Sequence, residues 1–97
     1  MALQIKVMHD YQCDPLWVKR ADIFMPESPD RHGLSASLVG RLEAWRLWGE
    51  SRTNLADPHD SRVISEEEAA GFDAEGRLLA ARIGTELPGA TVSYWLD

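Results

Sequence analysis

The fold is decided by one stretch, SEEEAAGFDAEGRLLAARIGTEL, which spans residues 65–87. It opens with Ser65, and Glu68 follows three residues later, which is the capping-box pattern of a helix start. Apolar residues and one glycine then recur at helical spacing: Phe72, Gly76, Leu79, Ile83 and Leu87. Pro88 and Gly89 follow directly and favour a stop. The stretch therefore predicts a long helix with one buried face.

An earlier helix is predicted from about Ser35 to Glu50. Ser35 can accept a hydrogen bond from an N–H of the first turn. Leucine and tryptophan recur at helical spacing along one face, at Leu38, Leu42 and Trp45. This apolar face is expected to pack against that of the later helix.

Gly76 lies inside the apolar stripe of the later helix, although a glycine there costs roughly 1 kcal/mol relative to alanine. The cost is explained if an aromatic ring must approach the helix backbone at this point. We expect that ring to be Trp45 or Trp48 of the earlier helix.

Two segments alternate apolar and polar residues with the period of a strand. They are residues 3–8, where Leu3, Ile5 and Val7 share a face, and residues 90–96, where Val92 and Tyr94 lie opposite Trp95. Residues 16–24 are a weaker candidate, for which an edge strand and a loop are equally compatible. A turn is expected at 9–15, and loops are expected at 25–33 and 51–63.

These elements predict a two-layer α+β fold. The N-terminal and C-terminal strands, with a possible extra edge strand, form a small sheet that two helices cover. A chain of 97 residues suits one domain over residues 1–97.

The chain is acidic, with 10 Lys and Arg against 16 Asp and Glu and a net charge of −6. Residues 1–50 hold 6 basic and 7 acidic groups, a net −1, and residues 51–97 hold 4 and 9, a net −5. This charge repels phosphate, so neither nucleic acid nor an anionic membrane is the expected partner. A solubility role is the simpler interpretation of the acid.

The single cysteine, Cys13, excludes an intrachain disulfide and suits a reducing compartment. The N-terminus has no signal-peptide apolar block, and no apolar stretch approaches the ~20 residues that span a bilayer. A cytoplasmic location is expected.

No catalytic, cofactor or metal site is predicted. The sequence lacks a glycine-rich phosphate loop and the H-E-x-x-H and C-x-x-C patterns. Two polar segments keep an alternative open, a metal-binding protein or small enzyme that would use His9 and Cys13 together with Asp57 and His59. Adjacent carboxylates on a helix do not face one another, so Glu66–Glu68 is interpreted as a helix start and not as a catalytic pair.

Four tryptophans, Trp17, Trp45, Trp48 and Trp95, are the most unusual feature of the composition. Trp45 fits the core face of its helix. A small domain cannot readily bury all four indoles, and exposed aromatic residues are enriched at interfaces. The candidate interaction residues are therefore Trp17 and Trp95, with the acidic residues Glu66, Glu67 and Asp73, and ordinary packing is the alternative.

Three segments carry a resemblance: Asp10–Trp17, Leu34–Trp45 and Phe72–Ala80. Together they resemble a set of small, uncharacterised bacterial proteins with a Leu-Trp turn, a Leu-Ser-capped helix and a Phe-x-x-Glu-Gly-Arg-x-Leu-Ala helix. The resemblance implies the predicted fold and a bacterial cytoplasmic origin, and it implies no activity.

The leading hypothesis is a small acidic non-enzymatic protein-interaction module, for example an inhibitor of a toxin or an immunity-type protein. The expected partner is another protein, and the acidic second half would suit a basic one. A monomer and a homodimer that pairs through the edge of the terminal strand are both compatible with the sequence.

Overall fold

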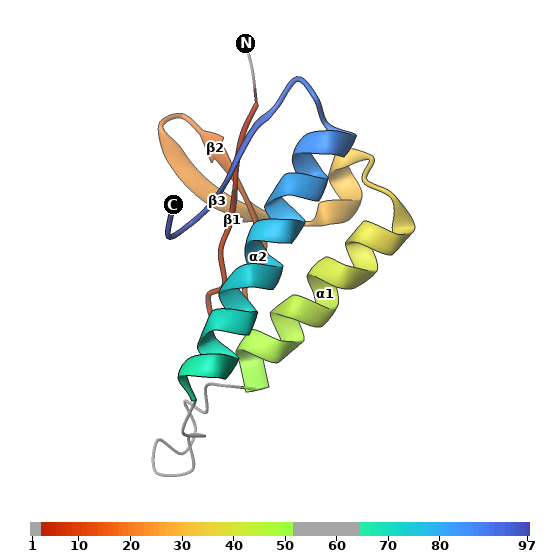
Figure 1. Cartoon of the computed structure of the whole chain (residues 1–97). Helices are drawn as coiled ribbons and strands as arrows, with labels where there is room; N and C mark the ends of the chain where they lie inside the picture. The colour runs from red at the N-terminus through yellow and green to blue at the C-terminus, as the bar shows by residue number, and fades with distance from the viewer. Residues whose placement is uncertain (1–2, 52–64) are drawn as a thin grey trace.

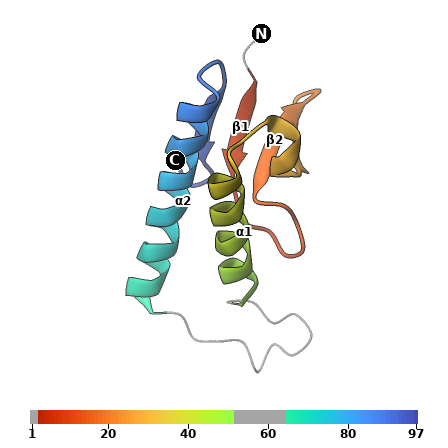
Figure 2. The ribbon, with the colours of Figure 1, turned by 90° about the vertical axis from the view of Figure 1, so that its right-hand side faces the viewer.

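The computed structural model describes residues 3–51 and 65–97. Its elements are, in chain order, β1 (Gln4–Val7), β2 (Leu16–Arg20), β3 (Ile23–Glu27), the 3-10 helix η1 (Pro29–His32), α1 (Ala36–Ser51), α2 (Glu66–Glu86) and β4 (Thr91–Tyr94). The strands form one sheet in the order β3-β2-β1-β4. Both long helices lie on the same face of this sheet (Figures 1 and 2), which confirms the two-layer α+β fold.

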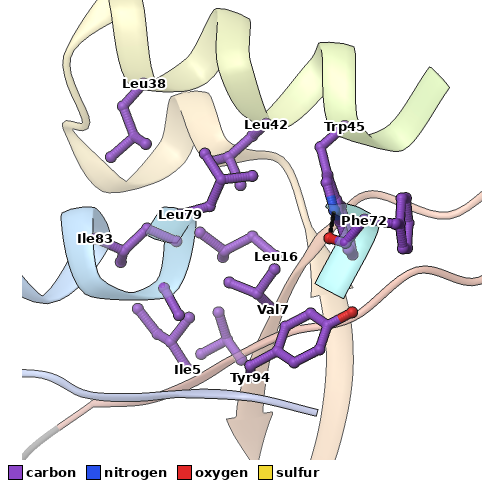
Figure 3. Packing of buried hydrophobic residues seen from close by; sticks show 12 residues of the cluster. Ile5, Val7, Leu16, Leu38, Leu42, Trp45, Phe72, Leu79, Ile83 and Tyr94 are labelled. Atoms are coloured by element: carbon purple, nitrogen blue, oxygen red, sulfur yellow. Dashed lines mark hydrogen bonds between the residues drawn. The ribbon is translucent and has the colours of Figure 1, made fainter. Parts of the chain in front are cut away.

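The first strand pairs in parallel with the last, which forms one edge of the sheet, whereas the other neighbouring strands are antiparallel. Ile5 pairs with Val92 and Val7 with Tyr94. The expected alternation holds, because Ile5, Val7 and Tyr94 are buried beneath the helices. The core that they share with both helices is shown in Figure 3.

The segment whose structure the sequence left open forms a β-hairpin. Residues 16–20 are β2, an interior strand between β1 and β3. Its two turn residues, Ala21 and Asp22, have φ angles of 50° and 67°, both in the left-handed region. A two-residue turn of this kind is normally signalled by Asn-Gly. Without that signal, the polar residues of the turn are compatible with a loop.

The loop predicted at 25–33 is wrong over its first three residues, which belong to β3. Pro26 favoured a loop because proline cannot donate to a ladder. Here, however, β3 is an edge strand, and proline is tolerated there. Residues 29–32 form η1, and the left-handed Gly33 (φ 70°) ends it.

The turn gives a stability prediction. Residues other than glycine pay roughly 1 kcal/mol or more for a left-handed backbone, although Asn and Asp tolerate it better than Ala. The double variant Ala21→Asn/Asp22→Gly should therefore raise the free energy of unfolding by about 1 kcal/mol in urea melts. Gly33→Ala, which forces a Cβ into the same region, should lower it by a similar amount. A double variant that melts earlier than the wild type would contradict the assigned turn.

The two helices are antiparallel, and polar contacts hold the start of α1 against the end of α2. The predicted caps are both confirmed, since Ser65 Oγ accepts from the Glu68 N–H at 3.0 Å and Ser35 Oγ accepts from the Leu38 N–H at 3.3 Å. The Ser35 N–H and hydroxyl also donate to the Glu86 carboxylate at 2.6 and 2.7 Å. These bonds lower the pKa of Glu86 below its usual range. They tie the start of α1 to the end of α2.

Candidate protein-interaction surface

The glycine in the α2 stripe lies against an aromatic ring, but the expected ring was wrong. A Cβ on Gly76 would lie only 2.2 Å from Cε1 of Tyr94 in β4. Trp48, one of the two expected residues, instead lies beside Gly71, where a Cβ would be 3.6 Å from its ring. The physical reason is that β4 packs against α2, which brings the Tyr94 ring directly against the helix backbone at Gly76.

This close approach directs the Tyr94 hydroxyl toward Asp73 of α2. The hydroxyl donates to Asp73 Oδ1 at 2.6 Å, and Tyr94 as a whole is only 1% exposed. Burial and then the hydrogen bond to Asp73 raise the pKa of Tyr94 well above its usual range. The phenol is therefore a permanent donor that fixes the Asp73 carboxylate at neutral pH.

An exposed tryptophan and an ion pair surround this hydrogen bond. The Trp95 ring lies 6.3 Å from the Tyr94 ring and is 45% exposed. The Arg77 guanidinium lies 5.2 Å from the Tyr94 ring, and its Nε donates to Asp97 at 3.0 Å. We call the five residues Asp73, Arg77, Tyr94, Trp95 and Asp97 the Tyr94 cluster. It brings together two predicted interaction residues, Asp73 and Trp95, that are far apart in the sequence.

The other predicted acidic residues gather at one end of the molecule, where α1 ends, α2 begins and β1 turns into β2 (Figure 2). Glu66 and Glu67 are exposed on the first turn of α2. Nearby, Glu50 at the end of α1 accepts from the Gln12 N–H at 2.8 Å. We call this region the acidic end; its carboxylates are Asp10, Asp14, Glu50, Glu66, Glu67 and Glu68.

Two of the four tryptophans are internal, and each satisfies its indole N–H. Trp45 is 1% exposed, donates to the Phe72 carbonyl at 2.9 Å and stacks on the Phe72 ring at 4.4 Å (Figure 3). Trp48 is half-buried and donates to Glu68 Oε1 at 3.1 Å. The expected core position of Trp45 is confirmed.

Trp17 is separate from the other predicted interaction residues. It is half-buried on β2 and donates to the Met8 carbonyl at 3.1 Å. Its neighbours Leu16 and Val18 are buried under the helices, so alternation places Trp17 on the opposite face of the sheet. The predicted residues are therefore divided among three places: Trp95 and Asp73 in the Tyr94 cluster, Glu66 and Glu67 at the acidic end, and Trp17 on the face of the sheet opposite the helices.

The segment with His9 and Cys13 does not offer an activated thiol. Partial burial, followed by the charges of Asp10, Asp14 and Glu50, raises the pKa of Cys13, so the thiol is protonated at neutral pH and is a poor nucleophile. The His9 ring lies against Gly49 and meets the Trp45 and Phe72 rings edge-on at 6.3 and 6.2 Å.

The other polar segment proposed for metal binding or proton transfer is the loop at 51–63. Asp57 and His59 lie outside the described residues. Within residues 3–51 and 65–97, no group of three or more His, Cys, Asp or Glu side chains could hold a metal ion. His32, to which the sequence assigned no role, lies 3.1 Å from the Glu27 carboxylate.

Three residues of the Tyr94 cluster, Arg77, Tyr94 and Asp97, were missed as candidates. A signal for Tyr94 was present, since Gly76 pointed to a ring and Tyr94 alternates onto the core face. The pairing of Arg77 with Asp97 depends on where the chain turns after β4, and no local pattern predicts that position.

No helix in the described part of the chain is both long enough and apolar enough to cross a membrane.

Comparison with known proteins completes the description of this surface. No curated protein matches the chain. A family model does match, over residues 3–97, and its family is described as Serratia CdiI immunity protein-like. The match includes every strand and helix as well as the three segments that carry the resemblance noted above. Because nearly the whole chain is covered, the protein belongs to the Serratia CdiI immunity protein-like family.

Proposed function

We propose that this protein binds a toxin protein in the bacterial cytoplasm and blocks it by occupying its surface, without catalysing a reaction. The observation that carries the proposal is the family match over residues 3–97. An immunity protein acts by binding another protein.

We further propose that the toxin contacts the Tyr94 cluster and that the acidic end steers its approach. Trp95 is an exposed aromatic residue beside a fixed carboxylate and an arginine, a combination typical of interface centres. The acidic end has Glu66 and Glu67 exposed on the same helix that carries Asp73. Carboxylates of this kind favour a basic partner, and their main effect is on the association rate.

The test starts with the wild-type chain. The toxin is captured from the source bacterium, identified and purified, and binding is measured by calorimetry alongside the activity of the toxin. We expect a one-to-one complex in which toxin activity falls in proportion to occupancy. Light scattering of the free chain shows whether it is a monomer or a homodimer before it binds. Saturating binding with no loss of toxin activity would reject an immunity role.

Two variants separate the contact from the steering. Trp95→Ala should raise the dissociation rate of the toxin complex about tenfold or more, because a desolvated aromatic holds the complex together. Glu66→Gln/Glu67→Gln should mainly lower the association rate, and the difference from the wild type should shrink as salt rises from 50 to 500 mM. Surface plasmon resonance measures both rates.

The matched control is Asp22→Asn/Asp30→Asn. It also removes two negative charges, but it takes them from the hairpin turn and from η1, which lie away from the acidic end. It should leave both rates close to those of the wild type. Equal slowing of association by both double variants would mean that net charge, and not the acidic end, steers the partner.

A further inference from the structure

One face of the sheet is not covered by any element of residues 3–51 and 65–97. Both long helices pack on the other face, and no other described segment crosses this one (Figures 1 and 2). The strand register gives the residues that the uncovered face presents. They are Gln4, Lys6, Trp17, Lys19, Phe24, Pro26, Thr91 and Ser93, and we call this set the open sheet face.

The charge of the open sheet face is opposite to that of the chain. The whole sequence contains two lysines, Lys6 and Lys19, and both lie on this face. None of its eight strand positions is acidic. Among the described residues neither lysine takes part in an ion pair, whereas arginines elsewhere on the surface do, as with Arg77 and Asp97. A chain with a net charge of −6 therefore presents a locally positive face.

Aromatic side chains lie between the two charges. In the register Lys6 is directly opposite Trp17, and Lys19 is directly opposite Phe24. The Lys6 ammonium extends across the face to within 4.2 Å of the centre of the Phe24 ring. Trp17 and Phe24 are half-buried although no helix covers them. The face thus combines two aromatic rings with two cations on the interior strands β1 and β2, and neither cation has an ion-pair partner among the described residues. Aromatic and cationic groups together are typical of protein-binding surfaces.

We infer that the open sheet face is a second docking site, which takes a carboxylate-bearing surface of another protein. The inference goes beyond the proposed function, because this face lies on the opposite side of the sheet from α2, which carries Asp73 and Glu66. Carboxylates of the partner pair with Lys6 and Lys19, and its apolar groups cover Trp17 and Phe24.

Two other occupants fit the face less well. A symmetric dimer that stacks two open sheet faces would bring four lysines together without a carboxylate, and like charges at an interface are unfavourable. Nucleic acid is repelled by the net charge of −6, and two lysines are far fewer cations than proteins that bind along a phosphate backbone use. A protein surface with carboxylates satisfies both lysines.

The test uses nuclear magnetic resonance with a defined probe. The full chain is titrated with a ten-residue peptide of alternating glutamate and threonine, with a lysine–threonine peptide and a ten-nucleotide oligothymidine in parallel. The glutamate peptide should give saturable shifts of the Trp17 indole N–H and of the Lys6, Lys19 and Phe24 amides. Neither of the other two probes should shift these signals to saturation.

Charge reversal supplies the matched comparison. Lys6→Glu/Lys19→Glu should weaken binding of the glutamate peptide about tenfold or more. Arg31→Glu/Arg82→Glu changes the net charge equally but alters η1 and α2, so it should keep most of the affinity. Circular dichroism of both variants checks that the fold is intact.

The inference is wrong if the Trp17 signal does not move, if oligothymidine gives the same saturable shifts, or if both charge reversals weaken binding equally. These outcomes are independent of the toxin. If the chain binds no toxin but passes this test, the proposed function is rejected and the second docking site is retained. If it binds and inhibits a toxin but fails this test, the proposed function is retained and the second site is rejected.

Discussion

Replacing Gly76 with alanine should lower the free energy of unfolding by about 1–3 kcal/mol. The new methyl group would lie 2.2 Å from Cε1 of Tyr94, well inside contact distance. The ring cannot easily move away, because it is only 1% exposed and its hydroxyl is bonded to Asp73 at 2.6 Å. Overpacking of this kind typically costs 1–3 kcal/mol, which exceeds the gain of up to ~1 kcal/mol from better helix propensity.

The matched control for this change is Gly71→Ala, one and a half turns earlier in the same helix. Its Cβ would lie 3.6 Å from the Trp48 ring, which is ordinary contact, and the site is exposed. This variant should be neutral or more stable than the wild type by up to about 1 kcal/mol. Urea melts of the two variants measure the contrast. Equal effects at both glycines would contradict the placement of Tyr94 under α2.

Trp45→Ala should have the largest effect on stability, a loss of about 3–5 kcal/mol. The indole is buried, stacks on Phe72 at 4.4 Å and donates to the Phe72 carbonyl at 2.9 Å. Total stabilities of small domains are only about 5–15 kcal/mol, so this variant can lie close to complete unfolding. Trp45→Phe keeps a ring in the core and loses the indole N–H, and it should cost less than the alanine variant.

The surface tryptophan provides the contrast for Trp45. Trp95 is 45% exposed, so Trp95→Ala should change the free energy of unfolding by no more than about 0.5 kcal/mol. The same variant should weaken toxin binding strongly. A large loss of stability in Trp95→Ala would mean that this indole is a packing residue and that its effect on binding is indirect.

The elements that the sequence predicted best are those whose signals are local. The capped start of α2, its apolar stripe and the alternation in β1 and β4 each depend on residues within one element. The β2–β3 hairpin was harder, because its turn uses Ala21 and Asp22 in left-handed conformations in place of Asn-Gly. Strand order was harder still, since pairing of Val7 with Tyr94 joins residues at opposite ends of the described chain.

The candidate site shows the same limit. The glycine at position 76 correctly indicated a close aromatic ring, but the identity of the ring depends on which element packs under α2. Trp95 and Asp73 were selected separately, and only the position of Tyr94 shows that they share one cluster. The immunity-type interaction module predicted from composition and from the missing catalytic motifs is confirmed by the family match.

The parallel pairing of β1 with β4 has a consequence for the order in which the molecule assembles. Residues 4–7 are synthesised long before their partners, residues 91–94. Until then β1 has β2 on one side and an unpaired edge on the other, and closing so long a loop carries an entropic cost that local contacts avoid. The Tyr94 ring completes the core only at that stage. The sheet and the core beneath α2 are therefore completed together, in the one step that brings residues 91–94 beside β1.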